Sequence, residues 1–324
     1  MRNAWIRWGA AVAAAALVAL PAMADSFPTK TVRIVVPYPA GGATDNLARQ
    51  VSTVLAEKTG QSFIVDNKPG GATVIAAQAL IQAPPDGHTV AFFDPSTVAM
   101  NQFLFKRLAY DPTTSIVPVT QMVRIHFGLM VRADAPYKTL KEYVDAAKAK
   151  PGTITFGSSG AGNAVHLAGE RFKGLAGIET AHIPYRGGAP AMQDLVGGQI
   201  PSVWMDLTSA MPFVKAGQVR VLAVASTKRS DALPDVPTFA ESGYPGFTAG
   251  SWFGVFVPAG TPAPVIAQIN GLFREAIANP KITSWLATVS LDPATGTAAE
   301  FANLIKSDTE AYGAVIKRIG FSLD

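Results

Sequence analysis

The tripeptide Gly-Gly-Ala occurs three times in this chain, each time where an apolar run gives way to a helical pattern. The copies begin at Gly41, Gly70 and Gly187, and a Ser-Gly-rich passage at 157–163 has similar chemistry. The first turn of a helix carries unpaired N–H groups and a partial positive charge. Glycine lets a ligand approach that backbone closely. Several such helix starts facing one crevice would bind a small anion with few charged side chains.

Strand and helix signals alternate in the N-terminal half of the chain. A buried strand is expected at 31–36, and further strands are expected at 63–65 and 89–93. Helices follow the first two strands, and Thr44 or Asp45 could cap the first helix while Gly60 suits its end. Repeated β-α-β order implies an α/β fold with a mainly parallel sheet, in which ligands sit beyond the carboxyl ends of the strands. Both of the first Gly-Gly-Ala turns lie at those ends.

The sequence predicts two capping boxes, one at 139–142 and one at 297–300. A second strand-helix series lies between them. Its strands are expected at 153–156, 181–185, 202–205 and 220–225. Large aromatic residues in and near both series are expected in the core, namely Phe93, Phe156, Trp204, Trp252 and Phe253.

Extended segments near 123–131 and 246–257 connect the two series and predict a two-strand hinge. We therefore expect two lobes, the second inserted into the first, with a central ligand cleft between them. The predicted first lobe is 25–124 together with 247–324, and the predicted second lobe is 125–246. Two lobes joined by extended strands can close on a ligand.

The first 24 residues have the pattern of a secretory signal peptide. Arg2 and Arg7 form a basic region, an apolar stretch follows at 10–20, and Ala-Met-Ala at 22–24 suits cleavage. The alternative, a membrane anchor, needs about 20 apolar residues, and this stretch is shorter. The pattern predicts export, and the absence of cysteine fits a bacterial periplasm and excludes a lipid anchor at the cleavage site.

Composition argues against several other classes of protein. The chain has 27 basic and 23 acidic residues without a block of like charge, so nucleic-acid binding is not expected. Four scattered histidines and no cysteine give no metal-ligand spacing, so no metal is expected. The passage at 157–163 does not fit a dinucleotide fingerprint and the P-loop lysine is absent, so no cofactor is expected.

Five groups of residues together resemble the Bug receptors, the extracytoplasmic solute-binding subunits of tripartite tricarboxylate transporters. They are Val-Val-Pro-Tyr-Pro-Ala-Gly-Gly-Ala-Thr-Asp at 35–45, Asn-Lys-Pro-Gly-Gly-Ala at 67–72, Ile-Pro-Tyr-Arg-Gly-Gly at 183–188, Gly-Gly-Gln at 197–199, and Trp-Phe-Gly with Pro-Ala-Gly-Thr-Pro at 252–262. The resemblance covers essentially the whole mature chain. It implies a type II periplasmic-binding-protein fold, a small carboxylate ligand and a membrane transporter with a large and a small integral subunit.

The resemblance also implies where the ligand is held. In the first lobe two loops would grip one carboxylate through backbone amides, at Tyr38, Ala40, Gly41, Gly42, Ala43, Thr44, Gly70, Gly71, Ala72 and Thr73. In the second lobe the opposite wall would include Ser158, Ser159, Asn163, Tyr185, Arg186 and Asp206. The family often has an acidic residue where Pro201 stands, and Trp204 is bulkier than expected, so an indole in the cleft would change the size of the ligand.

Several residues have two interpretations. Asp45 could bind ligand, but a carboxylate is also favoured at a helix start. Asp206 could accept from a ligand hydroxyl or ammonium or pair with a neighbour, and Arg186 could fork onto a carboxylate or be a solvated loop cation. Each of these choices stays open at the level of the sequence.

The whole chain also has rival interpretations. It could be an exported hydrolase acting in the same cleft, although Ser158 and Ser159 lack the G-x-S-x-G elbow. It could instead be a receptor whose loaded form engages a signalling partner. We expect a monomeric binding protein that is not an enzyme.

Overall fold

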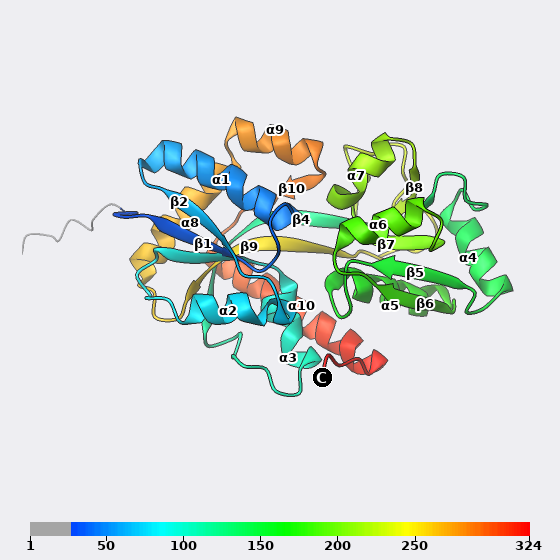
Figure 1. Cartoon of the computed structure of the whole chain (residues 1–324), viewed down its shortest axis with the longest axis horizontal. Coiled ribbons are helices and arrows are strands. Elements are labelled where there is room, and N and C mark those ends of the chain that lie inside the picture. Colours follow the sequence, from blue (N-terminus) through cyan, green and yellow to red (C-terminus); the bar gives the residue numbers. More distant parts are fainter. Residues whose placement is uncertain (1–26) are drawn as a thin grey trace, which may run out of the picture.

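The computed structural model describes residues 27–324, so the predicted signal peptide at 1–24 lies outside the described residues. Two lobes lie side by side along the long axis of the molecule (Figure 1). The strands are β1 (Val32–Val36), β2 (Phe63–Asn67), β3 (Thr89–Phe93), β4 (Ile116–Arg132), β5 (Ile154–Ser158), β6 (Thr180–Pro184), β7 (Ser202–Asp206), β8 (Val219–Val224), β9 (Gly250–Pro258) and β10 (Leu291–Pro293).

The helices cover both faces of the sheets. They are α1 (Ala43–Thr59), η1 (Gly71–Thr73), α2 (Val74–Ile81), η2 (Ser96–Met100), α3 (Asn101–Leu104), α4 (Leu140–Ala149), α5 (Ala164–Ala176), α6 (Gly188–Val196), α7 (Leu207–Lys215), α8 (Ala263–Ile277), α9 (Pro280–Thr288) and α10 (Ala298–Ile319). Among the described residues, no helix is long and apolar enough to cross a membrane.

Strand β4 joins the sheets of the two lobes. In the first lobe β1 pairs in parallel with β2 and β3, β3 is antiparallel to β9, and β9 is antiparallel to β4. In the second lobe β5 pairs in parallel with β6 and β7, and β4 is antiparallel to β7 and β8. The partners of β4 change between His126, which faces Gly250 of β9, and Phe127, which faces Asp206 of β7.

The expected strand at 123–131 is wrong in length, because β4 begins at Ile116. The register of β4 against β9 shifts between Pro118 and Thr120 and again between Gln121 and Val123. The irregular stretch contains Pro118 and the polar residues Thr120 and Gln121. The alternation of apolar and polar residues by which a strand is recognised is therefore lost there.

The strand directions turn the carboxyl ends of both parallel sheets toward each other. Strand β4 runs from the first lobe into the second, so β3 runs toward the lobe boundary and β7 runs back toward it. Phe93 at the end of β3 is level with Gly254, which pairs with Gln121 of β4, whereas Asp206 at the end of β7 is level with Phe127. At about 3.3 Å per residue, these two ends are separated along β4 by roughly 20 Å. The loops that follow the parallel strands therefore begin on the two sides of this interval.

Alternate residues of β1 and β3 pack on opposite helical layers. In the first lobe Ile34 and Phe92 belong to the cluster packed on α1 and α8, while Val35 and Phe93 belong to the cluster packed on α2 and Phe301 of α10. Trp204, at 2% exposure, stacks on Phe239 with ring centroids 5.2 Å apart, so the indole is part of the core of the second lobe. Phe93, Phe156, Trp252 and Phe253 are buried as expected.

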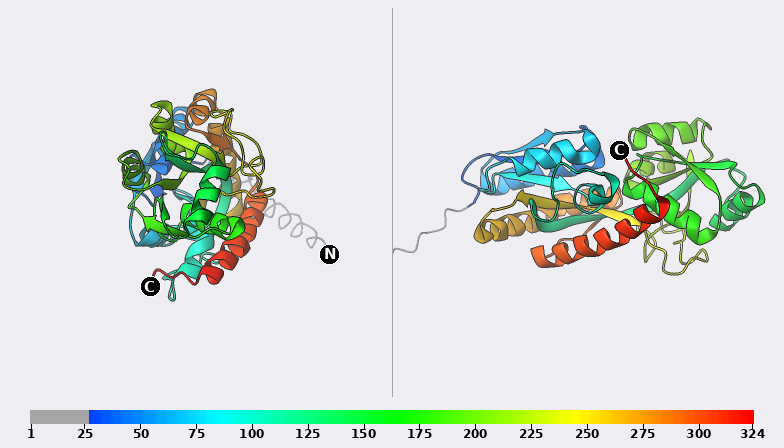
Figure 2. Two further views of the ribbon diagram at one scale, coloured as in Figure 1. Left: turned by 90° about the vertical axis from the view of Figure 1, so that its right-hand side faces the viewer. Right: turned by 90° about the horizontal axis from the view of Figure 1, so that it is seen from below.

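Helix α10 and the residues after it run beneath both lobes (Figure 2). The tail returns to the first lobe, where the backbone N–H of Leu323 donates to the carbonyl oxygen of Leu104 at 2.8 Å. The ring of Phe321 lies edge-on to His166 of the second lobe, with centroids 5.4 Å apart. The C-terminal tail is therefore a third contact between the lobes, beside β4 and β9.

Helix ends follow the sequence with two exceptions. The capping box of α10 and the left-handed Gly60 after α1 are as expected. At α4 the Thr139 side chain caps the helix as expected, but the Glu142 carboxylate accepts from the backbone N–H of Lys138 and not from that of Thr139, so the capping box is incomplete. The proposed cap by Thr44 is wrong, because α1 begins at Ala43 and its N-cap, Gly42, has no side chain to accept a hydrogen bond. Asp45 nevertheless serves this helix start, since its carboxylate accepts from the backbone N–H of Gly41 at 2.8 Å.

Candidate functional site at the lobe boundary

The first predicted grip loop joins β1 to α1 and is open to solvent. Gly41 and Gly42 are exposed, Ala43 is half-buried and Thr44 is buried. Within residues 27–324, the backbone N–H groups of Gly42, Ala43 and Thr44 have no hydrogen-bond acceptor in the protein. They are the unpaired donors that a helix start leaves, and they lie beside a glycine surface that a ligand can reach.

The second predicted grip loop joins β2 to α2 and has an unusual backbone. Gly70, Gly71, Ala72 and Thr73 all have positive φ, at 114°, 57°, 48° and 77°. The first three of these residues are exposed, and Thr73 is 4% exposed. The backbone N–H of Thr73 donates to the carbonyl oxygen of Gly70, and the N–H groups of Gly71 and Ala72 have no acceptor among the residues described.

Asn67 and Asp45 fasten the two loops to each other. The side-chain nitrogen of Asn67 donates to the carbonyl oxygen of Tyr38 at 2.9 Å and to the carboxylate of Asp45 at 3.0 Å. Arg49 donates to the same carboxylate at 2.9 Å. Burial raises the pKa of Asp45, but the hydrogen bonds from Arg49, Gly41 and Asn67 outweigh burial and hold this pKa below its ordinary value. Asp45 is thus committed to the protein, which is the structural interpretation of this residue.

A third segment, which was not among the predicted site residues, also lies at this edge. The residues after β3 run from Asp94 through the π-helical turn η2 into α3. The Tyr38 hydroxyl donates to the carboxylate of Asp94 at 2.5 Å, and the backbone N–H of Ser96 donates to the same group at 3.0 Å. Burial raises the pKa of Asp94 and of Tyr38. The Asp-Pro-Ser-Thr sequence at 94–97 lies directly after a predicted strand, and this sequence is the signal that could have identified the third segment.

In the second lobe, the loop after β5 is held by side chains that cap its helix. Asn163 accepts from the backbone N–H of His166 at the start of α5, and its side-chain nitrogen donates to the Ser159 hydroxyl at 3.0 Å. Ser159 and Asn163 are half-buried. Ser158 is fully buried, and its hydroxyl contacts the carbonyl oxygen of Gly160 and Nε2 of His182.

Two stacked imidazoles lie beneath this loop. His166 and His182 have ring centroids 3.8 Å apart and planes inclined by 20°. Nδ1 of His166 accepts from the backbone N–H of Gly162 at 3.0 Å, so this ring is neutral with its proton on Nε2. Burial, followed by the charge of Lys173, lowers the pKa of His166 to about 4. Burial, followed by His166, lowers the pKa of His182 to about 3.

The remaining second-lobe candidates follow β6 and β7. The backbone N–H of Tyr185 donates to the carbonyl oxygen of Ser158, and its hydroxyl donates to Asp194 at 2.7 Å. Arg186 is exposed. Asp206 is the N-cap of α7, accepting from the backbone N–H and the hydroxyl of Ser209, and burial raises its pKa. The pairing of β5 with β6 and β7 brings all six second-lobe candidates to one edge.

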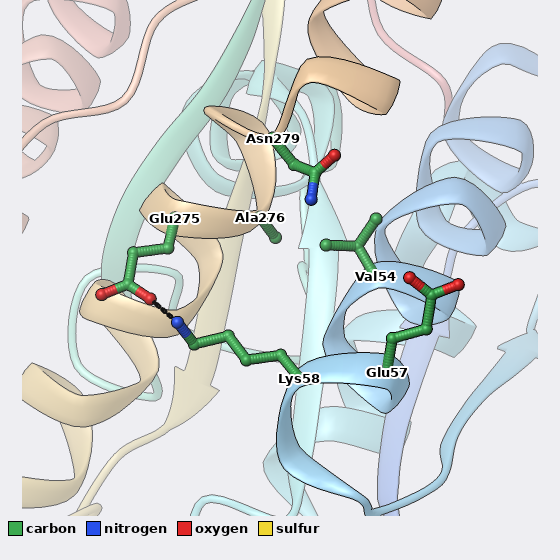
Figure 3. Close-up of a pocket in the computed structure, with 6 residues that line it drawn as sticks. All are labelled: Val54, Glu57, Lys58, Glu275, Ala276 and Asn279. Atoms are coloured by element: carbon green, nitrogen blue, oxygen red, sulfur yellow. Dashed lines mark hydrogen bonds and ion pairs between the residues drawn. The ribbon is translucent and has the colours of Figure 1, made fainter.

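A cavity elsewhere on the first lobe contains none of these residues. It has a volume of about 310 Å³ and lies between α1 and α8, lined by Val54, Glu57, Lys58, Glu275, Ala276 and Asn279 (Figure 3). An ion pair between Lys58 and Glu275 crosses it. Among the described residues, no group of three His, Cys, Asp or Glu side chains is placed to hold a metal ion.

Two lobes linked by β4 and β9, with the carboxyl ends of their parallel strands facing each other, define the class of two-lobe periplasmic binding proteins. The model of one family, described as the tripartite tricarboxylate transporter family receptor (TctC), matches residues 47–321. The chain belongs to this family, as its resemblance to the Bug receptors predicts.

Relatives and solved structures agree with this assignment. The chain is 36% identical over 293 residues to a UPF0065 protein of Pseudomonas sp., covering 90% of this chain and 87% of that protein. It is 30% identical over 311 residues to BugT of Bordetella pertussis, covering 96% and 95%. An R. palustris protein solved with adipate aligns with a TM-score of 0.85 at 32% identity, over 91% of this chain and 99% of that one. MatC from Rhodopseudomonas palustris with bound malate aligns with a TM-score of 0.79 at 29% identity, over 90% and 100%.

Proposed function

We propose that this protein is a periplasmic receptor that captures a small organic carboxylate between its lobes and delivers it to a tripartite tricarboxylate-type transporter. The observation that carries the proposal is the pair of adjacent exposed loops at 38–44 and 70–73, which present unpaired backbone N–H groups and contain no charged side chain. Hydrogen bonds from such donors to a carboxylate are charge-assisted and need little ordering of side chains.

In this proposal the first lobe binds one carboxylate and the second lobe closes over the rest of the ligand. The first-lobe contacts are the predicted residues of the two grip loops, and the opposite wall consists of Ser158, Ser159, Asn163, Tyr185, Arg186 and Asp206. We place the lobe boundaries as the sequence predicts, with 125–246 inserted between 25–124 and 247–324. Support comes from β4 and β9, which pair with each other up to the point where β4 changes partners.

The proposal extends to location and partners. The sequence pattern at 1–24 is that of a signal peptide, which would direct the chain to the periplasm. The solved relatives include a periplasmic transporter protein and the periplasmic binding protein BugD. A monomer would carry its ligand to the large and small membrane subunits. The relatives solved with adipate and malate support an aliphatic dicarboxylate as ligand.

Isothermal titration of the mature protein tests the ligand class. We expect micromolar or tighter binding of at least one member of a panel containing malate, succinate, adipate, citrate and an aromatic carboxylate. The matched diamide of the best ligand should bind at least a hundredfold more weakly, because it lacks the charge that strengthens the hydrogen bonds. Binding of a sugar or a cationic amino acid in place of every carboxylate would overturn the proposal.

We also propose that the protein is not an enzyme. The Ser158 hydroxyl lies 2.7 Å from Nε2 of His182, the geometry of a nucleophile and base, but Ser158 is fully buried. With its pKa lowered to about 3, His182 would be a weak base at neutral pH. Activated esters should therefore be hydrolysed no faster by the wild type than by Ser158→Ala or Ser159→Ala variants. Turnover that depends on either serine would contradict this part of the proposal.

A further inference from the structure

The backbone of the second grip loop is in a conformation that its own residues disfavour. Ala72 and Thr73 have φ values of 48° and 77°. A side chain with a Cβ rarely adopts this left-handed region, and Thr is branched at Cβ. Such residues persist only where the surrounding structure holds them. The loop therefore needs a partner that fixes it from outside.

Asn101, the first residue of α3, donates side-chain hydrogen bonds to this loop. Its side-chain nitrogen donates to the carbonyl oxygen of Ala72 at 2.7 Å, and it lies 3.3 Å from the Thr73 hydroxyl. The Thr97 hydroxyl donates to the Thr73 hydroxyl at 2.9 Å. Asn101 and Thr97 are 1% and 0% exposed, so water does not compete with these hydrogen bonds.

Tyr110 fixes the asparagine and the threonine from the other side. Its hydroxyl donates to the carbonyl oxygen of Thr97 at 2.6 Å and accepts from the side-chain nitrogen of Asn101 at 3.2 Å. The nitrogen of Asn101 thus serves the loop and Tyr110, whereas the buried side-chain oxygen of Asn101 has no partner among the described residues. In this orientation the amide directs its donor, and not its acceptor, at the carbonyl oxygen of Ala72.

The π-helical turn η2 determines where Thr97 and Asn101 lie. It begins at Ser96 and ends at Met100, directly before Asn101. Single π-helical turns inside helices are rare, and those that occur often lie at functional sites. Here the turn follows β3, so it places two side chains behind a loop that follows β2.

We propose that Asn101, assisted by Thr97, is a positioning residue for anion binding: it holds the carbonyl oxygen of Ala72 inward and thereby keeps the N–H groups of Gly71 and Ala72 exposed for the ligand. The inference rests on the proposed function for its effect on affinity. Its effect on the loop backbone is independent of any ligand.

The test compares Asn101→Ala with a matched control, Asn270→Ala. Asn270 also donates its side-chain nitrogen to backbone carbonyl oxygens of the first lobe, those of Val119 and Gly296, but does not contact either grip loop. We expect Asn101→Ala to weaken binding of the best carboxylate by about tenfold, as expected for the loss of one well-made hydrogen bond. Asn270→Ala should lower the melting temperature while leaving the Kd within twofold of the wild type.

A rescue variant separates positioning from a general loss of stability. Glycine adopts positive φ without strain, so Ala72→Gly in the Asn101→Ala background should restore several-fold of the lost affinity. Hydrogen exchange without ligand should be faster in the 70–76 peptide of Asn101→Ala and unchanged there in Asn270→Ala. Equal affinities for the wild type and Asn101→Ala, or unchanged exchange in this peptide, would overturn the inference. If no carboxylate binds the wild type, the proposed function fails, and the exchange measurement still decides the positioning role.

Discussion

Replacing Ala43 by proline is expected to weaken carboxylate binding by roughly ten- to a hundredfold without lowering the melting temperature. Ala43 is the first residue of α1, and its N–H group has no acceptor within residues 27–324. The substitution removes this single donor and changes no charge. A hydrogen bond to a charged group contributes about 1.5–3 kcal/mol, which corresponds to the expected loss.

The local backbone makes this substitution compatible with the fold. Proline is favoured at the first position of a helix, where its missing N–H group is unpaired in any case. The residue before a proline must be extended, and Gly42 already has φ of −77° and ψ of 172°. The folded protein is therefore expected to keep its stability, and a change in affinity can be assigned to the lost donor.

Calorimetric titration with the best ligand measures the loss, and Ala298→Pro is the matched control. Ala298 is the first residue of α10, after the extended N-cap Thr297 with ψ of 160°, and lies outside the candidate site. The control should bind like the wild type. If Ala43→Pro folds and also binds like the wild type, the N–H group of Ala43 does not hold the ligand, and the first grip loop loses its proposed role.

The fold could be predicted from the sequence because each signal was local. Apolar runs gave β1, β3 and β7 within a residue or two of their observed bounds. Gly60, the Thr139 cap of α4 and the capping box of α10 mark helix ends through hydrogen bonds between residues a few positions apart. Two elements that escaped prediction depart from a regular α-helix: η2 is a π-helical turn, and α7 carries Pro212 inside it, so neither matches the ordinary helical pattern.

The candidate site was only partly predictable, because several of its residues act on the backbone of a distant segment. Glycines at 41–42 and 70–71 mark the loops by themselves. Asn101, by contrast, contacts Ala72 across 29 positions of the chain, and no pattern in either segment indicates the pairing. Asn163 and Asp206 are also N-caps, so their sequence context is explained by the helices α5 and α7 whether or not they touch a ligand.

The histidine pair beneath the second-lobe loop predicts a loss of stability in acid. In the unfolded chain both imidazoles take up protons near their ordinary pKa of 6.5, whereas in the folded protein burial delays protonation to about 4 for His166 and about 3 for His182. Below about pH 6.5 the unfolded state therefore binds more protons than the folded state, and stability falls as the pH falls. Above this pH neither group contributes to the change.

The expected effect is large for two residues. Each tenfold difference in proton affinity between the two states corresponds to about 1.4 kcal/mol. Between about pH 7 and pH 4.5 we expect the pair to lower the free energy of unfolding by about 5 kcal/mol. Protonation of His166 at Nδ1 would turn the acceptor of the Gly162 N–H into a second donor and break this hydrogen bond. The loop at 158–163 should therefore loosen first.

Urea denaturation at a series of pH values measures this loss, and a double variant isolates the histidines from the carboxyl groups that titrate in the same range. In His166→Asn the amide oxygen can still accept from Gly162, and in His182→Gln the amide nitrogen can still donate to Ser158, but neither side chain titrates. The double variant should lose about 5 kcal/mol less than the wild type over this pH interval. Parallel loss in both proteins would show that the two imidazoles are protonated equally in the folded and unfolded states.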